Sequence, residues 1–228
     1  MRSIGEPFQL FYTFFKVSVG NFLEERFVQK NFHKNLRFKK VDSDLAEGYK
    51  EKSPYQISKE FLQQKGEINI HVYGETYLST MYKVAKRIGI STNDHVVEMG
   101  CGRGRTSLFL ASHFGCKVHG VDWIKAFTEN ASQVSARNSL SCATFSCNNM
   151  IEEDLSFATV IYLYGTCLDD STILTLIKKF SALPKGTKII TVSYSLLEYC
   201  EKPIFFLKDH FTARYPWGRT EIFIKELR

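Results

Sequence analysis

The residues best suited to chemistry stand in one short segment, residues 95–107, which reads His-Val-Val-Glu-Met-Gly-Cys-Gly-Arg-Gly-Arg-Thr-Ser. Its two valines read as the end of a buried strand, and the carboxylate of Glu98 follows them. Glycines then alternate at Gly100, Gly102 and Gly104, ahead of a segment that reads as a helix. A strand, a glycine turn and a helix N-terminus form a cradle for a ligand, because backbone N–H groups are free there. The alternative is a glycine-rich turn that binds nothing.

The spacing of the glycines separates two classes of cofactor. Dinucleotide-binding proteins carry Gly-x-Gly-x-x-Gly, and that pattern fails here because its last glycine would be Arg105. The pattern acidic-x-Gly-x-Gly-x-Gly resembles motif I of the class I, Rossmann-like methyltransferases, which bind S-adenosylmethionine (SAM). The Glu98 carboxylate would suit the cationic part of SAM, either directly or by bracing the turn. The resemblance implies a SAM site that includes Glu98, Gly100, Cys101, Gly102 and Gly104.

The ends of the next two strands carry side chains suited to an adenosine. Asp122 ends the second strand, and a carboxylate about 20 residues beyond such a turn can accept hydrogen bonds from ribose hydroxyls. Trp123 follows it and could shield one face of the adenine. Asn149 and Met150 follow the third strand and offer a hydrogen-bonding edge and an apolar neighbour to the adenine. The alternatives are an exposed acid and ordinary strand-end residues.

A second informative segment, Tyr-Gly-Glu-Thr at residues 73–76, leads into an amphipathic helix expected at residues 78–88. We expect Tyr73 and Glu75 to lie over the glycine turn, with Glu75 holding the ammonium of SAM or a backbone amide. We expect Thr76 to lie there too and to cap the helix. Tyr164 follows the fourth strand, where an open α/β sheet places its ligand, so it should face the sulfonium and the methyl acceptor.

These features together resemble a family. The Tyr-Gly-Glu-Thr element, motif I and an apolar fourth strand without Pro-Pro-Tyr are similar to the non-SET histone lysine methyltransferases of the disruptor-of-telomeric-silencing type. The similarity covers roughly residues 70–195, and Trp217-Gly218-x-Thr220 is similar to the last hairpin of related protein-lysine methyltransferases. The resemblance implies SAM-dependent methylation of a protein side chain, with lysine favoured. The chain departs from the family in Cys101 and in Tyr164-Gly165, where Asn is typical, so the acceptor stays open.

Methyl transfer from a sulfonium is an in-line displacement, which depends on alignment and desolvation. A lysine acceptor must be neutral, and a narrow, water-poor aromatic channel favours that state by lowering the lysine pKa. Tyr73 and Tyr164 are the candidate catalytic residues of such a channel, with Tyr194 and Trp217 as further wall residues; core packing is the alternative for each. The competing functions are an RNA or small-molecule methyltransferase and a SAM-binding interaction protein without catalysis.

From residue 96 onward, strand and helix patterns alternate, as in a doubly wound, mostly parallel sheet. We expect an α/β, Rossmann-like domain of seven strands at residues 71–228. Its strands are expected at residues 96–99, 117–121, 143–147, 158–163, 188–193, 205–211 and 221–225. The helices between them are expected at residues 106–114, 124–138 and 171–183.

Residues 1–70 read as a separate helical extension. A first helix is expected from Pro7 to about residue 22, and a second, capped by Asp42 or Ser43, to about residue 51. A third, at residues 55–65, starts behind a Ser-Pro cap. The apolar run at residues 8–23 is shorter than the about 20 residues of a spanning helix, so a packed or interfacial helix is expected. The basic residues Arg37, Lys39 and Lys40 read as a solvated face.

The composition limits the class of protein. The formal charge of +6 over 228 residues permits a nucleic-acid partner without demanding one, and a protein acceptor is favoured. Six cysteines without a Cys-x-x-Cys pair are typical of reduced thiols in a cytosolic protein. The same spacing disfavours a zinc site, so no metal is expected. The oligomeric state stays open.

Overall fold

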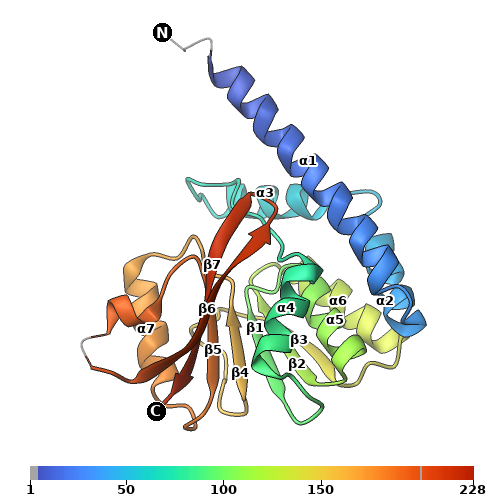
Figure 1. The fold of residues 1–228 in the computed structure, drawn as a ribbon. Coiled ribbons are helices and arrows are strands. Elements are labelled where there is room, and N and C mark those ends of the chain that lie inside the picture. Colours follow the sequence, from blue (N-terminus) through green and yellow to red (C-terminus); the bar gives the residue numbers. More distant parts are fainter. Residues whose placement is uncertain (1–4, 201) are drawn as a thin grey trace.

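A seven-stranded sheet in the order β3-β2-β1-β4-β5-β7-β6 forms the centre of the fold (Figure 1). The computed structural model describes residues 5–200 and 202–228, with side chains described from residue 16 onward. All neighbouring strands are parallel except β7, which lies antiparallel to both β5 and β6. The strands are β1 His95–Met99, β2 Lys117–Asp122, β3 Ala143–Cys147, β4 Val160–Leu163, β5 Lys188–Val192, β6 Phe205–Tyr215 and β7 Gly218–Leu227. The expected Rossmann-like α/β fold is confirmed.

Two apolar cores lie on opposite faces of this sheet, because successive side chains of a strand point to opposite sides. Val96 of β1 packs into the first core, and Val97 and Met99 pack into the second. The first is covered by α4 (Leu78–Ile88), α5 (Arg105–Phe114) and α6 (Lys125–Arg137), and the second by α7 (Asp170–Phe180) and the short η1 (Leu196–Tyr199). Figure 1 shows α7 on the side of the sheet away from α4. The alternating strand and helix pattern therefore predicted both layers.

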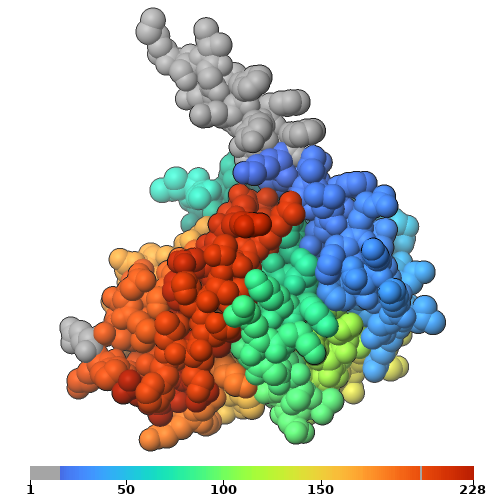
Figure 2. Space-filling model, in the orientation of Figure 1, coloured from blue at the N-terminus to red at the C-terminus, as the bar shows by residue number. Residues whose placement is uncertain are grey.

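Two of the three N-terminal helices, α1 (Gly5–Asn31) and α2 (Leu36–Glu47), pack into the first of these cores. The third, α3 (Pro54–Gln64), adds no residue to it, and Ser58 is its one buried residue. Val28, Phe38 and Val41 are fully buried, and the Phe38 ring meets Phe109 of α5 edge to face at 5.0 Å. Figure 2 shows the blue N-terminal helices directly against the green α4. The boundary expected at residue 70 stays a prediction, but α1 and α2, which precede it, share the core of the domain.

The structure corrects two local expectations. The first helix continues to Asn31 instead of ending near residue 22. The second starts at Leu36, and its cap is Asn35, whose side chain accepts from the Phe38 N–H at 3.2 Å. Capping by Asp42 or Ser43 is therefore wrong, because both lie inside the helix. The third helix is confirmed, with a capping box between Ser53 and Gln56.

Other expectations concern the surface and the thiols. Arg37, Lys39 and Lys40 are exposed on α2, as a solvated face requires. Among the described residues, no helix is long and apolar enough to cross a membrane. For the apolar run at residues 8–23, the side chains of residues 8–15 lie outside the described part of the chain. All six cysteines are free thiols, and the cytosolic location stays a prediction.

Candidate functional site

The glycine turn between β1 and α5 is held by the neighbouring strand β2. The N–H groups of Gly100 and Cys101 both donate to the carbonyl oxygen of Val121, at 2.9 and 3.0 Å. The three glycines have φ angles of 79°, 54° and 78°, so each occupies the left-handed region. A Cβ on Gly104 would also lie 2.7 Å from the Phe145 ring. Gly104 therefore serves the packing of α5, whereas Gly100 and Gly102 face a cavity.

That cavity has a volume of about 610 Å³, within the range of small-molecule sites, and lies at the carboxyl ends of the parallel strands. It brings together most of the expected site residues, namely Tyr73, Gly100, Gly102, Asp122, Trp123, Asn149, Met150 and Tyr164. It also includes Ser58, Phe61 and Leu62 of α3. Sequence reasoning missed α3, because an apolar helix face is a normal sign of core packing and nothing local links it to the strand ends.

Asp122 is the carboxylate best placed in this cavity. Its Oδ2 accepts from the Gly102 N–H at 2.8 Å, and its Oδ1 accepts from the Ile124 N–H at 2.9 Å. Burial raises the pKa of Asp122, and the backbone N–H groups oppose that effect. Each carboxylate oxygen can accept a further hydrogen bond, since it has two lone-pair sites. Asp122 therefore fixes the turn and still has acceptor capacity toward the cavity.

Glu98 faces helix α5 instead of the cavity. Its two carboxylate oxygens accept from the hydroxyls of Thr106 and Ser107. Only 2% of the residue is exposed. Burial raises the pKa of Glu98 to about 7, although the two hydroxyls act in the opposite direction. Of the two roles expected for Glu98, the geometry fits the bracing of the turn.

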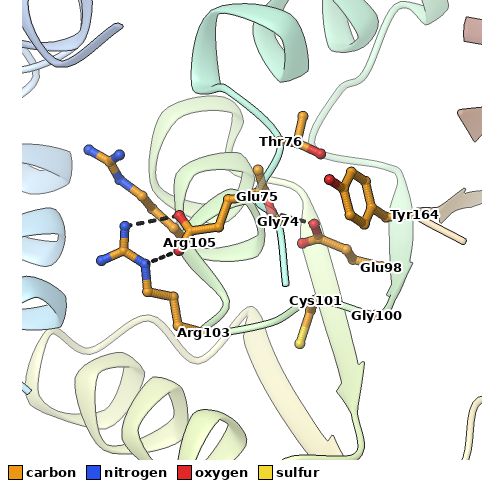
Figure 3. A pocket seen from close by; sticks show the side chains of 10 residues that line it. Gly74, Glu75, Thr76, Glu98, Gly100, Cys101, Arg103, Arg105 and Tyr164 are labelled. Atoms are coloured by element: carbon orange, nitrogen blue, oxygen red, sulfur yellow. Dashed lines mark hydrogen bonds and ion pairs between the residues drawn. The ribbon is translucent and has the colours of Figure 1, made fainter. Parts of the chain in front are cut away.

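Glu75 is paired with an arginine of the same turn. Arg103 donates to it through Nε at 2.7 Å and through Nη2 at 2.9 Å (Figure 3). The Tyr73 hydroxyl also donates to Oε1 of Glu75, at 2.7 Å. Burial favours a raised pKa for Glu75, but the Arg103 charge outweighs it and the pKa is lowered. Glu75, Thr76, Glu98 and Cys101 line a small space beside the main cavity. The expected contact of Glu75 with an ammonium group stays a prediction.

Thr76 does not cap α4. No side chain caps that helix from its N-cap residue, Tyr77. The Thr76 hydroxyl instead shares a hydrogen bond of 2.8 Å with the Tyr162 hydroxyl, which meets that of Tyr215 at 3.0 Å. The predicted cap is wrong because the side chain points to the sheet and finds its partner in β4. Thr76 thereby ties its segment to the sheet beside the cavity.

Tyr164 forms an aromatic wall with Trp217 at the tip of the β6–β7 hairpin. The two rings meet edge to face at 5.7 Å. A Cβ on Gly74 would lie 2.7 Å from the Tyr164 hydroxyl and 3.2 Å from the Trp217 ring. The two rings therefore leave room only for glycine at position 74. Burial raises the pKa of Tyr164 far above its usual value, so the phenol stays protonated. Of this pair only Tyr164 lines the cavity; Trp217 and Tyr194, the two further candidate wall residues, are outside the lining.

Two arginines beside Gly104 were also missed as site residues. Arg103 binds Glu75, and Arg105 binds Asp42 of α2 and Glu25 of α1. A signal was present in the sequence, because the helix dipole disfavours a cation in the first turn of a helix. An arginine there implies carboxylate partners from elsewhere in the fold.

The lining of the cavity is acidic. Its ionisable acids are Glu67, Asp122 and Asp169, and none of its described lining residues is Lys, Arg or His. This contrasts with the net charge of +6 for the whole chain. Within the described residues, no group of three His, Cys, Asp or Glu side chains could hold a metal ion. The cavity therefore favours a cationic ligand.

Comparisons with solved structures show the same fold. An RNA methyltransferase from Salinibacter ruber, in complex with S-adenosyl-L-homocysteine, superposes with a TM-score of 0.54 at 17% identity, over 65% of this chain and 90% of that chain. TrmN from Thermus thermophilus gives a TM-score of 0.58 at 17% identity, over 69% of this chain and 51% of that chain. Likeness at this identity concerns the fold alone.

Sequence comparisons are more specific. A Dictyostelium discoideum protein described as histone-lysine N-methyltransferase, H3 lysine-79 specific, is 28% identical over 210 residues. The match covers 83% of this chain but only 11% of that protein's length. The family model for histone methylation protein DOT1 matches residues 56–201, a range that includes most of α3, the strands β1 to β5 and η1. Since this match spans more than half of the chain, the protein belongs to the DOT1 histone methylation family.

Proposed function

We propose that this chain is a SAM-dependent methyltransferase that modifies a protein side chain, with lysine as the favoured acceptor. Its family supports the reaction class, and the relative named for a histone lysine supports the acceptor. The observation that carries the choice of acceptor is the cavity lining, which holds Glu67 and Asp169 besides the candidate ribose partner Asp122, and no described basic residue. A catalytic enzyme is favoured over a binding protein because the aromatic wall stands beside the same cavity.

The chemistry of the lining fits SAM. The free acceptor capacity of Asp122 suits the two ribose hydroxyls. Asn149 and Met150 at the end of β3 offer a polar edge and an apolar face to the adenine. Gly100 and Gly102 leave bare backbone for the amino-acid end, and a Cβ on Gly102 would lie 3.4 Å from the Tyr73 ring. These residues would hold the cofactor by shape and by acceptor groups, without a metal.

The acidic lining favours a basic protein over RNA. A groove that binds a nucleic acid needs cations, because neutralisation of phosphates supplies most of the affinity. This cavity offers carboxylates in their place, which attract a cationic side chain and repel phosphates. The hydroxyls of Tyr73 and Tyr164 and the indole ring of Trp217 suit an alkyl chain that carries an amine.

When bound, SAM supplies an electrophilic methyl group on its sulfonium. Tyr164 and Tyr73 both have a pKa raised by burial, so neither phenol serves as a base at neutral pH. The wall of Tyr164 and Trp217 acts by excluding water, which favours the neutral amine. The ammonium proton is lost to solvent as the side chain enters. The chain contributes alignment and desolvation, which suffice for an in-line displacement.

Incubation of the full chain with methyl-labelled SAM and either core histones or total RNA tests the proposal. We expect label in the histone fraction that is sensitive to protease and resistant to nuclease, and mass spectrometry should locate it on lysine. Asp122→Asn in parallel shows whether the label depends on this cavity. Label in RNA would assign the acceptor to nucleic acid. Tight S-adenosylhomocysteine binding without any transfer would favour the interaction protein.

A further inference from the structure

The two arginines that flank Gly104 reach in different directions from the glycine turn. Arg103 meets Glu75, and Figure 3 shows the Arg105 side chain directed away from that pair. Both are largely buried, with exposed side-chain fractions of 16% for Arg103 and 12% for Arg105. The turn is thus attached at two adjacent points to segments that precede β1 in the sequence.

The Arg105 guanidinium binds two carboxylates at once. Its Nε and Nη2 donate to Oδ1 and Oδ2 of Asp42 at 2.7 and 2.8 Å. Its Nη1 and Nη2 donate to Glu25 at 2.5 and 3.1 Å. Asp42 has an exposed side-chain fraction of 7% and also meets His33 Nε2 at 2.9 Å. All of these partners come from α1, α2 or the short connection between them.

The position of Arg105 is unfavourable for helix α5 on its own. It is the first residue of the helix, where the dipole favours acids, and the N-cap Gly104 provides no side-chain hydrogen bond. Burial also opposes the charge of Asp42, yet the Arg105 pairing lowers the Asp42 pKa overall. The arrangement holds because three charged groups of α1, α2 and α5 satisfy one another. β2 already holds the three left-handed glycines through Val121 and Asp122. The Arg105 cluster adds a separate attachment at the end of the turn where α5 begins.

We propose that Arg105, held by Glu25 and Asp42, is a positioning residue that fixes the glycine turn in the conformation that receives SAM. Helices α1 and α2 thereby belong to the cofactor site, although none of their residues with a described side chain lines the cavity. The ligand in this proposal rests on the proposed function; the fixing of the turn does not. A preorganised turn binds its ligand more tightly because less ordering remains to be done on binding.

The test uses the full chain and pairs of matched variants. Glu25→Gln and Arg105→Gln each remove one side of the ion pair, and Arg105→Lys keeps the charge. Asp44→Asn is the control, since Asp44 also lies on α2 and binds Lys40 at 2.8 Å without contact to the turn. The measurements are the dissociation constant of S-adenosylhomocysteine, the melting temperature without ligand, and the hydrogen exchange of a peptide covering residues 99–105.

We expect Arg105→Gln to weaken S-adenosylhomocysteine binding at least tenfold and Glu25→Gln about fivefold. The double variant should be no weaker than Arg105→Gln alone, since both changes break one unit. Without ligand, hydrogen exchange at residues 99–105 should be faster in Arg105→Gln and in Glu25→Gln than in the wild type. Arg105→Lys should bind S-adenosylhomocysteine more tightly than Arg105→Gln does. Asp44→Asn should change neither the affinity nor the exchange.

The proposal is overturned if affinity and exchange stay at the wild-type level while the melting temperature falls, because Arg105 would then only stabilise the fold. If Arg105→Gln does not fold, Glu25→Gln decides, since its side chain is 46% exposed and the change is isosteric. A wild-type chain that does not bind S-adenosylhomocysteine would contradict the proposed function. In that case the exchange measurement still decides whether Arg105 fixes the turn.

Discussion

Glu24 of α1 caps helix α4 through Ser79, although the two residues are 55 positions apart in the sequence. Its Oε1 accepts from the Ser79 N–H at 2.9 Å, and its Oε2 accepts from the Ser79 hydroxyl at 2.6 Å. The carboxylate also stands at the positive end of the helix dipole, which favours it further. Glu24 and Glu25 are therefore adjacent carboxylates with different partners, a helix end and a turn arginine.

Replacement of Glu24 by alanine should reduce stability without touching the cofactor. Loss of a helix cap costs about 1 kcal/mol, and the charge adds to that, so we expect a loss of about 1–2 kcal/mol. Urea unfolding measures the stability, and calorimetry with S-adenosylhomocysteine measures the affinity in the folded protein. A fall in affinity as large as that of Glu25→Gln would show that the two carboxylates act on the same feature.

Asp122→Asn should weaken cofactor binding at least tenfold. The amide keeps one acceptor oxygen but loses the charge, and charge-assisted hydrogen bonds contribute roughly 1.5–3 kcal/mol each. Because Asp122 also accepts from the Gly102 N–H, we expect the melting temperature without ligand to fall slightly as well. Titration with S-adenosylhomocysteine and with adenosine should reveal equal losses for both, since both carry the ribose. An unchanged dissociation constant would remove Asp122 from the ribose site.

The ionisation of Glu98 should lower the free energy of unfolding as pH rises from about 4.5 to about 7. Burial raises its pKa from 4.5 to about 7 in the folded chain. Within this window the folded state keeps a proton that the unfolded state has lost, so the loss grows with pH. The shift corresponds to about 3 kcal/mol. Glu98→Gln should remove this contribution, and urea unfolding at pH 5 and pH 8 compares the two proteins. Identical pH dependence in both would mean that Glu98 is ionised throughout.

Gly74→Ala should reduce turnover more than it reduces cofactor affinity. The new Cβ would lie 2.7 Å from the Tyr164 hydroxyl and would displace the aromatic wall. Gly20→Ala is the matched control, because it places a Cβ 2.8 Å from the Tyr77 hydroxyl, between α1 and α4. We expect several-fold lower methyl transfer at saturating SAM for Gly74→Ala only. Equal turnover in both variants would show that the wall of Tyr164 and Trp217 does not act on the methyl acceptor.

The sequence predicted the sheet and its helices within a few residues, because strand and helix periods alternate and local signals mark their ends. Helix α3 is an example, since Ser53 and Pro54 predict its start and the structure has it there. Helix α2 is the contrary case. Asp42 has the chemistry of a cap, but it is used by Arg105, which lies 63 positions away. No local pattern carries such a partner.

The candidate site divides in the same way. Side chains that follow strands, such as Asp122 and Tyr164, were predicted to face a ligand because parallel strands end at one edge, and both line the cavity. Residues whose role depends on a distant partner were placed incorrectly or missed. Thr76 was assigned to a helix end but bonds Tyr162 of β4, and Arg103 was not assigned at all.

The glycine turn also sets which second-site changes could restore a damaged chain. At Gly102 the atoms nearest to an added carbon belong to Tyr73, at 3.4 Å, so within the protein the obstacle is backbone strain and not packing. Asparagine is the substitution best tolerated in the left-handed region, although any side chain there also meets the proposed site of SAM. At Gly104 the added carbon meets Phe145 at 2.7 Å as well. In a saturation library, survivors at position 104 should therefore carry a smaller residue at position 145. Survivors at position 102 should need no such suppressor.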